Sequence, residues 1–282
     1  MKGSFPVGKA GQLMHLELRG IYKYRLTIEY DGTNYHGWQT QQNARSIQGT
    51  LMSVAVRVLG GVIDLQGAGR TDAGVHALAQ TAHLVTAKRI APERLQAMLN
   101  NELPSGINIL GIEETDPDFH ARHHAKARSY LYLISRRRTA FGKRYVWWIR
   151  DNLSLKDMKA VMKVFVGFHD FASFADKRRE KVLSTMVMLH SCEIRAFDDL
   201  IVMRITASHF LWKMVRRIVG VTVEVGRGNL CFDEIKEMLE KTSDVPAKYT
   251  APPSGLFLER VLYEGDGPVS LNRPFFPFKG QT

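Results

Sequence analysis

Cysteine and long apolar runs are both scarce in this sequence of 282 residues. Its two cysteines, Cys192 and Cys231, are far apart and form no CxxC pair. This argues against a disulfide framework and against a cysteine-based zinc site, and it suits the reducing conditions of the cytoplasm. No apolar stretch has the length of a membrane span, and no basic amphipathic anchor stands out. The chain is therefore expected to be cytoplasmic, with no membrane partner.

Acidic residues are in the minority. Asp and Glu number 28 against 39 Lys and Arg, which gives a formal net charge of +11 and a pI near 9.7. A positive field of this size attracts nucleic acid and raises the rate of encounter, without fixing any sequence preference. The hydrophobic fraction of 45% and the charged fraction of 24% are ordinary for a soluble globular protein. Composition therefore favours RNA or DNA as the partner.

The first half of the chain alternates strand and helix patterns. Apolar and polar residues alternate over residues 24–30, which is the period of a half-buried strand. Apolar residues recur at helical spacing over residues 47–59, and a second helix begins near Pro92. Two short strands are expected at residues 62–66 and 80–86.

The second half partly repeats this order. Alternation at residues 130–134 predicts a strand, and Ser154 is expected to cap a helix that carries Met158 and Phe165. The remaining expected elements are a strand pair at residues 185–196 and 200–207, followed by helices at residues 210–222 and 232–239.

The repeated order predicts an α+β fold of two tandem halves, each a mainly antiparallel sheet with helices packed on one face. Residues 116–118, Asp-Pro-Asp, are the candidate linker. The expected organisation is an extension at residues 1–21, an N-terminal domain at 22–117, a C-terminal domain at 118–266 and a tail at 267–282. The extension lacks an apolar core of signal-peptide length. The tail carries the aromatics Phe275, Phe276 and Phe278, which are expected to dock on the body or on a partner subunit.

One loop carries the most information about function. Residues 67–77 read GAGRTDAGVHA and fall between the two short strands of the first half. They place Asp72 in a glycine-flanked turn, where a large ligand can approach the backbone closely. Arg70 stands two residues before it and favours its ionised form. An ionised carboxylate on such a loop suits nucleophilic or base chemistry on a polyanionic substrate.

The same loop has two other interpretations. The first is a tight turn with a structural Asp–Arg ion pair, since such pairs are common on protein surfaces. The second is a phosphate cradle, but no Lys-Ser/Thr follows the glycines and no helix clearly starts there. The residues of the loop alone leave these alternatives open.

The whole string at residues 67–77 resembles the signature of the TruA-type tRNA pseudouridine synthases. Further matches follow in order: Gly37-Trp38-Gln39, Gln48-Gly49, Arg128-Ser129-Tyr130, residues 167–174 (GFHDFASF), residues 210–220 (FLWKMVRRIVG) and residues 251–256 (APPSGL). They span residues 24–263 and leave only the two ends outside. The pair Ser208-His209 departs from the Asn-Ala or Asn-Ser that members often have, which leaves local substrate contacts open.

The resemblance implies a role for each matched residue. Asp72 would be the catalytic nucleophile, kept ionised by Arg70 and by Arg216 from the second half. Tyr130 of the R-x-Y element would stack on the target base, and Leu256 would line the uracil pocket. Arg128, from the same element as Tyr130, and Arg217 are expected to bind substrate, Arg217 through a phosphate.

The resemblance also implies an activity and an architecture. The activity is the isomerisation of uridine to pseudouridine in the anticodon stem-loop of tRNA, at positions 38 to 40, with no cofactor and no metal. The architecture is the pseudouridine synthase fold, with the active-site cleft between the two halves and a homodimer whose subunits share one tRNA.

Basic and aromatic residues are interleaved in the middle of the chain. The basic members are Arg122, Lys126, Arg128, Arg136, Arg137, Arg138, Lys143, Arg144 and Arg150, and the aromatic members are Tyr130, Tyr132, Phe141, Tyr145, Trp147 and Trp148. Cations neutralise phosphates and aromatic faces stack unpaired bases, so this cluster is expected to contact RNA. The neighbouring His120, His123 and His124 fit the same basic strip better than a metal site.

Two other functions compete with the isomerase. A non-catalytic RNA-binding protein would use the same basic surface and leave uridine unaltered. Phosphoryl transfer would use the glycine-rich loop and Asp72 with magnesium, but Asp64 is the only other carboxylate near that loop.

Overall fold

The computed structural model describes residues 20–62, 64–176, 184–267 and Leu271. The expected extension up to residue 19 and the tail aromatics Phe275, Phe276 and Phe278 lie outside the described residues. The expected domain boundaries stay a prediction.

Ten strands of the described residues form one sheet, in the order β4-β1-β3-β10-β5-β9-β8-β7, with β2 also on β3 and β6 also on β5. The strands are β1 (Tyr22–Tyr30), β2 (Asp64–Gly67), β3 (His76–Thr86), β4 (Ile107–Glu114), β5 (Ala127–Ser135), β6 (Trp147–Trp148), β7 (Gly167–Asp170), β8 (Met186–Phe197), β9 (Leu200–Ala207) and β10 (Leu256–Leu262). Most neighbours are antiparallel, as the α+β class requires.

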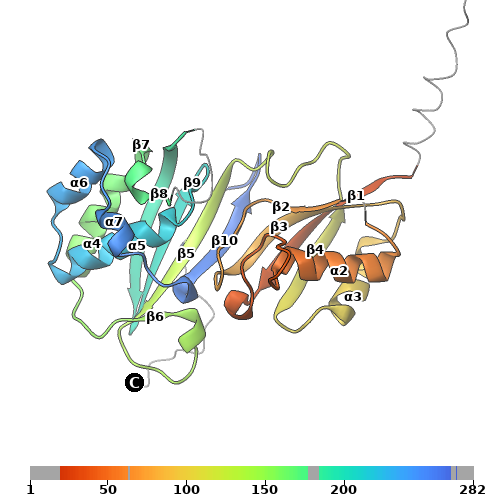
Figure 1. The fold of residues 1–282 in the computed structure, drawn as a ribbon, viewed down its shortest axis with the longest axis horizontal. Coiled ribbons are helices and arrows are strands. Elements are labelled where there is room, and N and C mark those ends of the chain that lie inside the picture. The colour runs from red at the N-terminus through yellow and green to blue at the C-terminus, as the bar shows by residue number, and fades with distance from the viewer. Residues whose placement is uncertain (1–19, 63, 177–183, 268–270, 272–282) are drawn as a thin grey trace, which may run out of the picture.

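Strand β10 joins the two expected halves. It pairs antiparallel with β5, with Leu256 opposite Tyr132, and parallel with β3, with Phe257 opposite His76. Figure 1 shows β10 in blue at the middle of the molecule, between β5 and β3. Sequence patterning did not predict this strand, because much of it is buried and its apolar residues do not alternate cleanly with polar ones. The two expected sheets are thus parts of one continuous sheet.

The helices gather beside the two ends of the sheet (Figure 1). They are α2 (Ile47–Leu59), α3 (Pro92–Glu102), α4 (Leu155–Met162), α5 (Met214–Arg227), α6 (Phe232–Glu240) and the short α7 (Val245–Lys248). The expected helices at residues 47–59 and from Pro92 are confirmed. The Ser154 side chain accepts from the backbone N–H of Asp157, which confirms the expected cap of α4.

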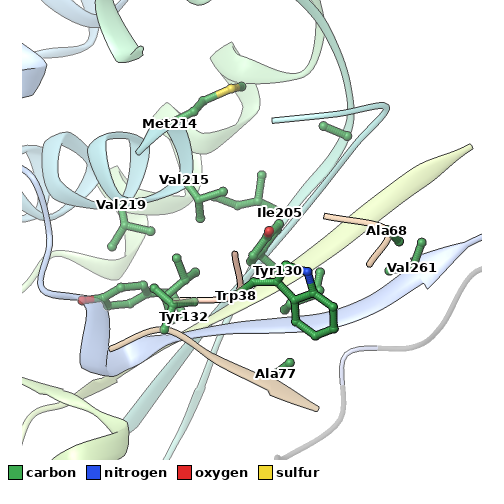
Figure 2. Packing of buried hydrophobic residues seen from close by; sticks show 14 of the residues in the cluster. Trp38, Ala68, Ala77, Tyr130, Tyr132, Ile205, Met214, Val215, Val219 and Val261 are labelled. Atoms are coloured by element: carbon green, nitrogen blue, oxygen red, sulfur yellow. The ribbon is translucent and has the colours of Figure 1, made fainter. Parts of the chain in front are cut away.

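Alternation along β5 separates the two faces of the sheet. Tyr130, Tyr132 and Ile134 belong to the main core, which also contains the buried residues of the helices. Figure 2 shows Val215 and Val219 of α5 in this core together with Tyr130 and Tyr132. The intervening Leu131 and Leu133 belong to a smaller cluster with Val146, Phe257 and Leu271. The larger core therefore lies on the face that carries Tyr130.

Helix α5 packs closely on the chain segment before β10. A Cβ placed on Gly220 would lie 1.5 Å from the carbonyl oxygen of Tyr249, so only glycine fits there. This approach lets the N–H of Ala251 donate to the carbonyl of Arg216 at 3.0 Å. The start of α5 is thereby fixed against the segment that leads into β10.

Replacing Gly220 with alanine tests this contact. Alanine raises intrinsic helix propensity by about 1 kcal/mol, but overpacking of a tight contact costs about 1–3 kcal/mol and here requires backbone movement. We expect Gly220→Ala to lower the thermal unfolding midpoint by roughly 3–8 °C, measured by calorimetry. The matched control is Gly111→Ala in β4, where a Cβ meets nothing within 4 Å. Equal midpoints for the two variants would contradict the contact.

Candidate active site

The loop that carries Asp72 is held by β1 and by the segment that follows β1. The hydroxyl of Tyr30 hydrogen-bonds that of Thr71 at 2.8 Å in a buried position. The backbone N–H of Trp38 donates to the carbonyl of Thr71 at 3.1 Å. A Cβ on Gly37, whose φ is +91°, would lie 2.3 Å from that same carbonyl oxygen. A glycine in this conformation lets the two segments touch, and the loop is fixed at Thr71, directly before Asp72.

The Asp72 carboxylate receives hydrogen bonds from the second half of the chain. The indole Nε1–H of Trp212 donates to Oδ1 at 2.9 Å, and the guanidinium Nη1 of Arg216 donates to Oδ2 at 3.3 Å. Arg216 is itself oriented by a bond from Nε to the carbonyl of Ala251 at 2.6 Å. The Asp72 side chain stays 23% exposed, so a substrate can reach it.

The carboxylate lies in a cleft of about 680 Å³. The expected site residues Arg70, Asp72, Arg128, Tyr130, Arg216 and Leu256 all line it. The Nε–H of Arg70 donates to Oε1 of Gln39 at 3.1 Å. The proposed role of Arg70 in keeping Asp72 ionised stays a prediction.

Tyr130 and Leu256 form an apolar wall of the cleft. Tyr130 on β5 is 8% exposed and meets the ring of Phe210 edge-on, with centroids 5.0 Å apart. Burial raises the pKa of its hydroxyl, and the charge of Asp72 raises it further. Tyr130 is therefore a neutral aromatic ring beside the carboxylate. Leu256 is the first residue of β10 and is 5% exposed.

Arg128 connects three segments around the cleft. Its Nη2 donates to the carbonyls of Ala68 and Arg122, each at 2.9 Å, and its Nη1 donates to the carbonyl of Ser208 at 3.0 Å. A guanidinium that donates to several carbonyls orients backbone. Arg128 thus links the start of the Asp72 loop to the turn before α5. The expected contact of Arg128 with substrate stays a prediction.

Arg217 lies outside the cleft lining, which corrects the expected phosphate contact. The residue is 8% exposed, its Nη1 donates to the carbonyl of Ala175 at 2.7 Å, and its Nη2 lies 3.8 Å from a carboxylate oxygen of Asp176. A guanidinium buried against Asp176 does not reach an RNA backbone. The two neighbouring arginines of α5 therefore serve different purposes.

Trp212 is the site residue that the sequence patterning did not predict. The spacing of Phe210 and Leu211 predicted a helix from residue 210, whereas α5 begins at Met214 after Lys213 in a left-handed conformation (φ 63°). Apolar spacing continues into the turn because Phe210 and Leu211 pack against the core. The available signal was the separation of Trp212 and Arg216 by four residues, which would have placed two donors on one side of the helix expected from residue 210.

The expected RNA-contacting cluster is divided by the fold. Arg122, Arg128 and Tyr130 line the cleft, while the ring of Tyr132 is buried in the core. Phe141 is 79% exposed, and Trp148 is 43% exposed with Arg138 lying 6.0 Å above its ring. RNA contact by these last residues stays a prediction.

The histidines of this region pack on one another. The rings of His120 and His123 have centroids 4.2 Å apart, and His83 meets His120 at 4.7 Å. Among the described residues, no group of three or more His, Cys, Asp or Glu side chains could hold a metal ion. In the same part of the chain, every helix is too short or too polar to cross a membrane.

The sequence matches the protein family described as tRNA pseudouridine synthase over residues 26–124 and 161–264. The chain belongs to this family. The enzyme class predicted from the sequence, a tRNA pseudouridine synthase, is thereby confirmed, as is the α+β fold.

Relatives in several bacteria support the same assignment to the tRNA pseudouridine synthases. The chain is 38% identical over 240 residues to tRNA pseudouridine synthase A of Thermoanaerobacter sp. (strain X514), covering 84% of this chain and 98% of the relative. It is 39% identical over 241 residues to tRNA pseudouridine synthase A of Acetivibrio thermocellus, covering 85% of this chain and 98% of the relative. It is 36% identical over 246 residues to tRNA pseudouridine synthase A 2 of Bacillus cereus, covering 86% of this chain and 100% of the relative.

His76, the tenth residue of the GAGRTDAGVHA string, is a buried support of the synthase cleft. It is 1% exposed, its Nδ1 accepts from the N–H of Gly32 at 3.1 Å, and its Nε2 lies 3.1 Å from the carbonyl of Arg144. Burial lowers the pKa of His76 below its ordinary value of 6.5, although the nearby Asp31 carboxylate acts in the opposite direction. The bond from Gly32 fits a neutral ring with the proton on Nε2, although Nδ1 also lies 3.1 Å from a carboxylate oxygen of Asp31.

This neutral histidine predicts a pH-dependent stability. Because the pKa of His76 is lower in the folded protein than in the unfolded chain, the unfolded chain binds this proton more readily below pH 6.5, and the free energy of unfolding falls as the pH drops. We expect the thermal midpoint to fall between pH 7.5 and pH 5.5, and to fall less for His76→Gln. The control His190→Gln, at an exposed position on β8, should keep the wild-type slope. If the thermal midpoint of His76→Gln fell with pH as steeply as that of wild type, this account would be contradicted.

Proposed function

We propose that this tRNA pseudouridine synthase converts uridine to pseudouridine at positions 38 to 40 of the anticodon arm, with Asp72 as nucleophile and without a cofactor. The observation that carries the proposal is the carboxylate of Asp72 in an open cleft, with both oxygens oriented by donors from the other half of the chain. This arrangement suits a group that acts repeatedly as an anion.

The target nucleotide must leave its stack to reach the cleft. Extrusion costs a few kcal/mol, less for a nucleotide in a loop than for one in a duplex. The freed uracil would stack on the ring of Tyr130, with Leu256 against its apolar edge. Both side chains are packed and line the cleft, which supports binding that orders the nucleotide more than the protein.

The chemistry is a rearrangement within one nucleotide. Asp72 acts on the ribose or on the uracil ring so that the bond between N1 and C1′ breaks. The detached base rotates and rejoins C1′ through C5, and the C5 proton is lost. Arg216, 3.3 Å from Oδ2, orients the Asp72 carboxylate before attack and after release.

Recognition of the rest of the tRNA would depend on charge and on a second subunit. The net charge of +11 provides the non-specific attraction to phosphate. A homodimer that holds one tRNA across both subunits would place the anticodon arm of that tRNA in the cleft of one of them. The reaction would take place in the cytoplasm.

Release of tritium from tRNA that carries C5-tritiated uridine tests the reaction directly. We expect release by the wild-type protein and none above background by Asp72→Asn, because an amide is a poor nucleophile. The affinity of Asp72→Asn for tRNA, measured by filter binding, should stay within about threefold of wild type. No release by wild type from a tRNA pool that it binds would point to a non-catalytic RNA-binding role.

A second pair of variants tests the stacking role of Tyr130. Tyr130→Phe keeps the ring and should retain turnover within about threefold. Tyr130→Leu keeps the apolar volume but loses the flat face, and stacking on an aromatic ring contributes about 1–3 kcal/mol per base. We therefore expect kcat/KM for Tyr130→Leu to fall by roughly tenfold to a hundredfold. Similar values for both variants would argue against stacking.

A further inference from the structure

The turn before α5 has an unusual backbone. Lys213 is the N-cap of the helix and has φ 63° and ψ 3°, a left-handed conformation that residues with a Cβ rarely adopt. The turn places Trp212 with its indole toward Asp72 and starts the helix that carries Arg216. A change in this turn would therefore move Trp212, whereas Arg216 is also held by its bonds to Ala251.

A buried carboxylate holds the turn in this conformation. The side chain of Asp176 is 2% exposed and lies 2.9 Å from the ammonium of Lys213 and 3.8 Å from the guanidinium of Arg217. The backbone N–H of Asp176 donates to the carbonyl of Trp212 at 3.0 Å. Asp176 thus contacts residues before, within and after the turn.

Lys213 links this carboxylate to the indole. Its ammonium lies 4.8 Å above the ring of Trp212 while it pairs with Asp176. The indole N–H can donate a hydrogen bond but cannot accept one. Its bond of 2.9 Å to Oδ1 therefore restricts the rotation of the Asp72 carboxylate.

We infer that Trp212 is a positioning residue for Asp72 and that Asp176 holds Trp212 in place through the turn at Lys213. The inference rests on the proposed function, since it takes Asp72 as the nucleophile. It adds two residues to the site. Trp212 orients the reacting carboxylate, and Asp176 acts without reaching the substrate.

The first test is Trp212→Phe, which keeps an aromatic ring and removes the N–H. A hydrogen bond to a charged group corresponds to about tenfold to a hundredfold in rate, so we expect kcat for tritium release to fall by that factor. The KM for tRNA should stay within about twofold, because the indole acts on Asp72 and not on RNA. A wild-type kcat would overturn the inference. So would a raised KM at unchanged kcat, which would make Trp212 a tRNA contact.

The second test uses Asp176→Asn alone and in combination. A catalytic group displaced by about 1 Å loses up to a hundredfold in rate, so we expect at least a tenfold fall in kcat. In the Trp212→Phe background, Asp176→Asn should lower kcat by less than about a further twofold, because both substitutions act through one hydrogen bond. The matched control is Asp151→Asn, which removes an exposed carboxylate paired with Arg227 at the far end of α5 and should leave kcat unchanged. Additive losses would overturn the role of Asp176.

A third comparison covers the case in which Asp176→Asn folds poorly. Glycine adopts a φ of 63° without a stabilising partner, so Lys213→Gly removes the need for the buried carboxylate. Adding Asp176→Asn to Lys213→Gly should then lower kcat by less than about threefold. A tenfold loss in that background would refute a role through the turn. If wild type itself releases no tritium, the proposed function fails, whereas normal release by both wild type and Trp212→Phe defeats this inference alone.

Discussion

The short parallel pairing of β3 with β10 is the constraint on which the rest of the structure depends. Two residue pairs, Phe257 with His76 and Leu258 with Ala77, join what would otherwise be two separate sheets. This junction sets the Asp72 loop, which leads into β3, beside the segment that leads into β10. Arg216 then bonds Ala251 on that segment and Asp72 on that loop. The contact between Arg216 and Asp72 is therefore a consequence of sheet register.

Buried and half-buried charges mark the same junction. Arg216 meets Asp72 across it, and on the other face of the sheet Arg204 of β9 reaches Glu259 of β10 with its Nε at 2.8 Å. Ser129, on the strand between them, donates to the same carboxylate at 2.7 Å. Buried ion pairs add little net stability, but one charge without its partner is costly. These pairs accordingly favour one alignment of the strands over slipped ones.

Sequence patterning located most elements because their burial is one-sided. Helices α2 and α3, the β8–β9 pair and the Asp72 loop could all be predicted from periodicity, turn residues and motif. Strand β10 could not, since a centrally buried strand shows no clean alternation. The start of α5 at Met214 could not be predicted either, since Phe210 and Leu211 pack against the core from the turn before it. Arg216 and Arg217 are adjacent and identical in type, so only the fold shows that the first faces the cleft and the second faces Asp176. Long-range partners such as Trp212 and Asp72 are 140 positions apart, and local patterns carry no information about such pairs.

The central position of β10 has a consequence for how the molecule is made. Residues 256–262 leave the ribosome long after β3 and β5, so these two strands exist for a time without the neighbour that separates them. Strand edges without a partner can pair with other chains, and contacts between distant parts of the sequence form slowly. The active site, completed by this late strand, can form only in the last stage of folding. A chain interrupted before residue 256 would display two open sheet edges in place of a cleft.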